Sequence, residues 1–159
     1  MATQFYVQVE GVKGSAADAA HKGWMDATNW NVGANHPGGF KHGGAGSTGK
    51  TAFTDLSFST HMDSAWPDMH LFCSNGKTIP KVKLECVKET GDSKITYLTI
   101  TLENCIVSSA SSNTSGDRPS ADYSFNFAKM TMDYKSQEVG GGSKGAVTHY
   151  WDVNTNKGG

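Results

Sequence analysis

Arginine is nearly absent from this sequence, and it has no long apolar run. Arg118 is the only arginine among the 14 basic residues, and the formal net charge is −1. Proteins that bind nucleic acid usually carry a basic surface with arginine side chains that grip phosphates. No stretch of 18 apolar residues occurs, as a membrane-spanning helix would require. We therefore expect neither a nucleic-acid partner nor a membrane span.

The sequence also has little of what marks a secreted, disulfide-bonded protein. The N-terminal residues MATQFYVQVE contain neither the basic nor the apolar region of a signal peptide. Cys73, Cys86 and Cys105 are odd in number and show no CxxC spacing, so we expect reduced and buried thiols. A chain made in the cytoplasm, and exported only by a route without a cleaved signal, fits both observations.

Alternation of apolar and polar residues dominates what is present. Phe5, Val7 and Val9 alternate with polar neighbours, as β-strands with one buried face do. The strands predicted in this way span about 4–10, 22–32, 51–60, 79–89, 95–108, 121–135 and 146–153. The length of 159 residues suits one domain, 1–159. We predict a mainly β fold, an antiparallel β-barrel of two sheets with one flanking α-helix.

The helix is predicted from about 64 to 75. Pro67 suits the first turn, Asp63 or Ser64 could cap the N-terminus, and Gly76 suits the left-handed position past the end. The strand at 121–135 changes phase, which predicts a β-bulge near Phe127–Ala128.

Glycine-rich or polar loops are predicted at 33–50, 108–120 and 139–145. The first contains Gly44-Ala-Gly-Ser-Thr-Gly-Lys50-Thr51, which fits the phosphate-binding pattern GxxxxGK[ST]. That site requires a helix after the lysine, whereas residues 52–60 have the composition of a strand. We therefore expect a flexible loop and no bound nucleotide.

No catalytic or metal-binding spacing is present either. The six histidines form no HxxxH or HExxH pattern, and the serines lack a GxSxG turn in its strand–turn–helix context. We expect no enzyme and no cofactor. The alternative is a β-barrel module that binds a ligand or carbohydrate through Trp24, Trp30, Trp66 and Trp151.

Several stretches, in order, are similar to the haemolysin-coregulated protein (Hcp) family over nearly the whole chain. They are Gly11-Val-Lys-Gly14, His21-Lys-Gly23, Asn29-Trp-Asn-Val-Gly33, Asp55-Leu-Ser-Phe58, the helix from Pro67 to Lys77, Tyr97-Leu98, Ile106-Val-Ser-Ser109, Phe125-Asn-Phe-Ala-Lys129 and Tyr150-Trp-Asp-Val-Asn154. The sequence departs from the family at Trp66, where a Ser or Thr cap is usual, and at Trp24-Met25, where an acidic pair is usual.

The resemblance implies a structural subunit of a type VI secretion tube, built of stacked hexameric rings and secreted without a signal peptide. It implies as partners other copies of the chain, a contractile sheath, a spike protein and small effectors, which the ring lumen would chaperone. Asn31 would face the lumen. The candidates for contact between stacked rings are residues of the 33–50 loop: His36, Phe40, Lys41, His42 and Lys50.

Overall fold

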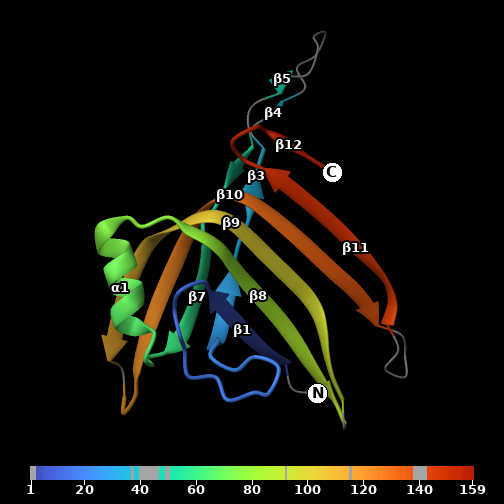
Figure 1. The fold of residues 1–159 in the computed structure, drawn as a ribbon. Coiled ribbons are helices and arrows are strands. Elements are labelled where there is room, and N and C mark those ends of the chain that lie inside the picture. The colour runs from blue at the N-terminus through green and yellow to red at the C-terminus, as the bar shows by residue number, and fades with distance from the viewer. Residues whose placement is uncertain are drawn as a thin grey trace.

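The computed structural model describes residues 3–36, 38–39, 47–48, 51–91, 93–114, 116–137 and 143–159. Its elements, in chain order, are β1 (Thr3–Val9), β2 (Met25–Asn31), β3 (Ala34–Asn35), β4 (Gly38–Gly39), β5 (Ser47–Thr48), β6 (Ala52–Phe53), β7 (Leu56–His61), α1 (Trp66–Asn75), β8 (Ile79–Thr90), β9 (Ser93–Thr114), β10 (Pro119–Gln137), β11 (Ser143–Asp152) and β12 (Lys157–Gly158). The predicted class, a mainly β antiparallel barrel with one helix, is confirmed (Figure 1).

Six strands close the barrel because β10 pairs with both ends of the strand order. The order is β10-β7-β2-β1-β8-β9, and β9 pairs again with β10. Helix α1 lies on one flank (Figure 1). The second half of β10 pairs with the first half of β9, and there β11 takes the edge of β10 that β7 occupies earlier in the strand.

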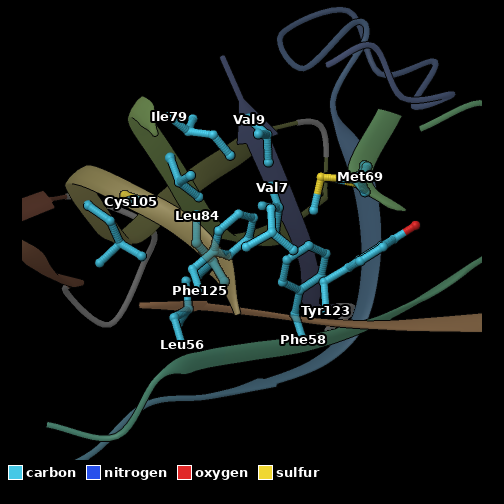
Figure 2. Packing of buried hydrophobic residues seen from close by; sticks show 14 of the residues in the cluster. Val7, Val9, Leu56, Phe58, Met69, Ile79, Leu84, Cys105, Tyr123 and Phe125 are labelled. Carbon is cyan, nitrogen blue, oxygen red and sulfur yellow. The ribbon is translucent and has the colours of Figure 1, made fainter. Parts of the chain in front are cut away.

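The interior is filled from every strand of the barrel. Phe58 lies among the aromatic rings of this core, 5.4 Å from Tyr123 and 5.9 Å from Phe125 between centroids (Figure 2). All three side chains are buried, as are Met69 and Phe72 on the inner side of α1. The alternating positions predicted as apolar therefore form one continuous core.

Of the predicted caps at the two ends of the helix, only the C-terminal one is present. Gly76 has φ 65° and ends the helix in the left-handed conformation, as predicted. Ala65 is the N-cap and makes no side-chain capping bond. Asp63 instead accepts the N–H of Ala65 at 3.0 Å, and Ser64 donates to the carbonyl of Lys13. The predicted capping role was wrong because these side chains hold the turn before the helix.

The predicted phase change of β10 exists, but no bulge lies at Phe127–Ala128. Three neighbouring strands change phase together, between the buried row Ile79–Cys105–Phe127 and the buried row Val82–Leu102–Met130. Because the strands change in step, their pairing needs no register shift there. The left-handed Asn104, with φ 52°, lies between the two rows. A register shift lies at Ser124/Phe125 instead, where β9 has the extra residue Ser108.

Two predicted loops contain strand structure. β9 runs to Thr114 and β10 starts at Pro119, so most of 108–120 is paired strand. Within 33–50, β3 pairs with β6 and β4 with β5. Composition misled at 108–114 because pairing with the long strand β10, rather than intrinsic β-propensity, holds these polar residues.

The cysteines are free thiols, and burial protects two of them. Cys86 and Cys105 are buried, while Cys73 is only partly buried, so the predicted protection of Cys73 is incomplete. Burial raises the pKa of the Cys86 thiol to about 11 and that of Cys105 to about 12.

We expect a thiol reagent at neutral pH to label Cys73 first. Raising a thiol pKa by two units lowers its thiolate fraction roughly 100-fold, so Cys86 and Cys105 should react at least that much more slowly than in urea-unfolded protein. Mass spectrometry of partly labelled, digested protein measures each site. Prompt labelling of Cys86 in the native protein would contradict the burial described above.

Candidate functional site

Four neighbouring strands share an outward face of small polar side chains. Strands β2, β7, β10 and the second half of β9 lie side by side in the barrel. Each alternates, so that Phe58 and Tyr123 point into the core while Ser57, Ser59 and Asp122 point outward. The strand register then aligns the outward residues into rows.

We call this surface the polar face and define it by three rows of paired residues. The rows are Asn31–Ser57–Ser124–Ser109, Asn29–Ser59–Asp122–Ser111 and His61–Ser120–Asn113. Side chains directly opposite one another on paired strands are about 5 Å apart. The polar face is therefore a continuous surface of hydroxyl, amide and carboxyl groups that spans four strands.

Side chains next to the first row are bonded to one another. Ser124 contacts the hydroxyls of both Ser108, at 2.9 Å, and Ser109, at 2.6 Å. Asp55 accepts from Ser108 at 2.5 Å and from the amide of Asn126 at 3.1 Å. The extra residue Ser108 in β9 allows two consecutive serines to reach Ser124. These bonds fix the side chains on an otherwise exposed surface.

In the second row of the polar face, Ser59 donates to Asp122 across the β7–β10 pair. The short hydroxyls and amides of the polar face favour bound water and hydrogen bonds over apolar adhesion. Such a surface suits a hydrated wall better than a reaction centre. Within the described residues, no group of three His, Cys, Asp or Glu side chains is placed to hold a metal ion.

A second feature is a wing, the sheet in which the second half of β10 (129–137) lies between β11 and the first half of β9 (Figure 1). One side of the wing continues the inward parity of the core through Leu98, Met132, Tyr134 and Val147. Tyr134 is 47% exposed and its cross-strand partner Val147 is 69% exposed. Residues at core parity are thus left uncovered in the single chain.

The other side of the wing is mainly polar, although Tyr150, the cross-strand partner of Thr131, is 44% exposed on it. Thr99, Thr101, Thr131 and Thr148 line a shallow hollow there, with Lys83 and Glu85 at its side. The exposed pair Tyr134 and Val147 lies on the side opposite this hollow. Large exposed apolar side chains that lie next to each other are typical of a surface that binds a partner.

The structure describes only some of the site residues that were predicted from the sequence. Asn31 is exposed and begins the first row of the polar face. His36, which directly follows β3, is exposed and is not part of the polar face. Phe40, Lys41, His42 and Lys50 lie outside the described residues. The serines of the polar face were missed, although the alternation of β7 and β10 already marks them as outward.

The phosphate-loop and tryptophan hypotheses find little support. Residues after Thr51 form β6 and β7, as predicted, where a nucleotide site needs a helix. Trp30 and Trp66 pack against the main core, and Trp24 packs against a smaller buried cluster with Tyr6 and Val87. Three of the four tryptophans thus serve packing rather than ligand stacking.

Comparison with known proteins gives one consistent result. The family model described as "Type VI secretion system effector, Hcp" matches residues 6–134. Protein hcp1 of Pseudomonas aeruginosa is 35% identical over 159 residues, which cover 98% of each chain.

Solved structures agree with this match. A type six secretion system protein has a TM-score of 0.91 at 26% identity and covers 99% of this chain and 100% of its own. Hcp1 from Salmonella typhimurium has a TM-score of 0.81 at 25% identity and covers 99% of both chains. A type VI secretion system effector from Yersinia pestis has a TM-score of 0.74 at 26% identity, with 93% of this chain and 98% of that one covered.

Proposed function

The chain belongs to the Hcp family of type VI secretion proteins, and from this premise we propose that it is a tube subunit that closes into rings of six. The family is one of secreted structural proteins and not of enzymes. Within the described residues, no helix is long and apolar enough to cross a membrane. The observation that carries the proposal is that one chain has both a hydrated polar face and an uncovered apolar side of the wing.

The wing supports closure of a ring. The apolar side of the wing and the polar face are different surfaces of the chain. A neighbouring copy would cover the wing with another part of its own surface. Such a heterologous contact repeats around a ring, whereas a contact between two identical patches ends at a dimer. Tyr134 and Val147 would lose their exposure in this contact, which makes association favourable.

The polar face supports the lumen. A ring with this face turned inward has a channel wall of serine, asparagine and aspartate side chains, and Asn31 contributes to it. A wall of this kind stays wet and holds a passing protein through hydrogen bonds rather than apolar contact. Small effectors would travel inside, and the ring would chaperone them until secretion.

The remaining partners follow from the family alone. Rings would stack through the 33–50 loop, with a contractile sheath outside and a spike protein at the tip. Synthesis in the bacterial cytoplasm would be followed by secretion through the type VI machine, without a signal peptide. His36, at the start of that loop, is exposed and available for such a contact.

Native mass spectrometry of the purified chain tests the assembly. We expect a species with six times the subunit mass, and light scattering should agree across micromolar concentrations. A stable monomer throughout that range would contradict the proposal.

The substitution Asn31→Glu tests the lumen assignment. Six added carboxylates on the channel wall should weaken retention of a small effector about ten-fold or more, because charge and bulk replace a neutral hydrogen-bonding group. Co-purification of a tagged effector from the same secretion system measures retention, and light scattering follows the ring.

The matched control is Asn31→Ser, which keeps a small polar side chain and should retain the effector. If Asn31→Glu dissociates the ring instead, Asn31 lies at the subunit contact and the lumen assignment is wrong.

A further inference from the structure

Residues 10–24 form a strap that joins β1 to β2 and folds back over the outside of the barrel. It is the blue loop between these strands in Figure 1. Two bonds fix its own shape: Gly14 N–H to the carbonyl of Gly23 at 2.8 Å, and Ala16 N–H to that of Trp24 at 2.9 Å. A Cβ at Gly14 would meet the Trp24 carbonyl oxygen at 2.4 Å, so only glycine fits.

His21 connects this strap to the barrel. Its side chain is 4% exposed, with Nδ1 2.6 Å from Asp18 Oδ2 in the strap and Nε2 2.6 Å from Glu85 Oε2 in β8. The ring stacks on Tyr6 of β1 at 4.1 Å and meets the edge of Trp24 at 4.7 Å. A buried imidazole is thus held between two carboxylates and two aromatic rings.

The number of protons on the ring follows from these contacts. A neutral imidazole has one donor and one acceptor, and an ionised carboxylate can only accept. Both ring nitrogens face carboxylate oxygens at hydrogen-bonding distance, so both must donate. The closed strap therefore contains an imidazolium, and a neutral ring would point a lone pair at Asp18 or Glu85.

Other charged groups lie around the ring and its two carboxylates. Lys94 of β9 lies 2.6 Å from Asp18 Oδ1 and 3.4 Å from Glu89, and Lys83 of β8 lies 3.4 Å from Glu85. Hydrogen bonds from Lys94 and then from His21 lower the pKa of Asp18 to about 2. From β2, Asp26 adds a carboxyl whose pKa is raised by burial and by Asp63 and Asp18.

We propose that His21 is a proton-dependent lock that holds the strap of residues 10–24 against β1 and β8. Closing the strap and protonating the ring are thermodynamically linked, because only the closed state supplies both acceptors. The lock holds while the ring is charged and weakens as rising pH removes its proton. Opening separates Ala16 and Trp24 of the strap from Tyr6 and Val87 of the barrel, with which they form a small apolar cluster.

Lys94 and Tyr6, which lie near His21, do not change charge near neutral pH. The hydrogen bond to Asp18 raises the pKa of Lys94, and burial raises the pKa of Tyr6, so both keep their neutral-pH form well into alkaline solution. Lys94 and Tyr6 therefore do not account for a change in the strap near neutral pH.

Amide hydrogen exchange in the full chain, corrected for intrinsic rates, tests the lock. We expect protection of the Gly14 and Ala16 amides to fall about ten-fold or more when exchange is compared at about pH 6 and about pH 9, while amides of the β8–β9 ladder stay protected. In Glu85→Gln the pH effect should vanish, because a neutral ring can donate to Asp18 and accept from the new amide. In His21→Leu the strap should be unprotected at every pH, with the β8–β9 amides reporting whether the barrel is intact.

Two results would overturn the lock. One is strap protection in the parent chain that does not change with pH. The other is the same pH dependence in Glu85→Gln as in the parent, which would show that the second carboxylate plays no part. The Glu85→Gln comparison decides the matter even if His21→Leu fails to fold.

Discussion

A Phe58→Ala variant should lose about 3–5 kcal/mol of unfolding free energy, the largest effect of any single change discussed in this protein. Phe58 is 2% exposed, and its ring packs against both Tyr123 and Phe125. Alanine would leave a cavity at the place where β7 and β10 meet inside the barrel. Close-packed neighbours cannot fill such a cavity fully, so lost burial and lost packing both contribute.

Urea unfolding followed by far-UV circular dichroism, at equal subunit concentration, measures this loss. The matched control is Ser57→Ala, the preceding residue on the opposite side of β7, which should change stability by no more than about 0.5 kcal/mol. Equal losses in the two variants would mean that the sides of β7 are wrongly assigned.

A Val147→Lys variant should abolish ring assembly and leave the subunit folded. Val147 is 69% exposed beside Tyr134 on the apolar side of the wing. In the proposed ring this position is covered by a neighbouring copy, and an unpaired buried ammonium group is strongly unfavourable there. We expect the contact to weaken by about 3 kcal/mol or more, which is over 100-fold in its dissociation constant.

Light scattering and native mass spectrometry should then find monomers at concentrations where the parent chain forms rings. Thr148→Lys is the control, since Thr148 lies next in sequence and points to the polar side of the wing. It adds the same charge and should keep the ring. Rings that persist in Val147→Lys and are lost in Thr148→Lys would place the contact on the other side of the wing.

Local sequence was sufficient for the elements whose environment is set by one strand or one helix. Period-two alternation located the core side of β1, β7 and β8, because a side chain in a strand can point to only two faces. Pro67 and Gly76 bracketed the helix to within about two residues, since each has a backbone conformation that suits a helix end. The same alternation could have identified Ser57, Ser59 and Asp122 as outward, although not as neighbours.

Tertiary structure alone decided the rest. The segment 108–114 has the composition of a loop and becomes strand because β10 offers it a complete row of hydrogen-bonding partners. The polar face exists only because the register of four strands brings Asn31, Ser57, Ser124 and Ser109 into one row. His21 and Glu85 are 64 positions apart in sequence, and no local pattern could pair them. Sequence thus indicated which side of each strand faces the core, and the closure of the barrel determined which exposed residues meet, because contact across strands depends on register rather than on local preference.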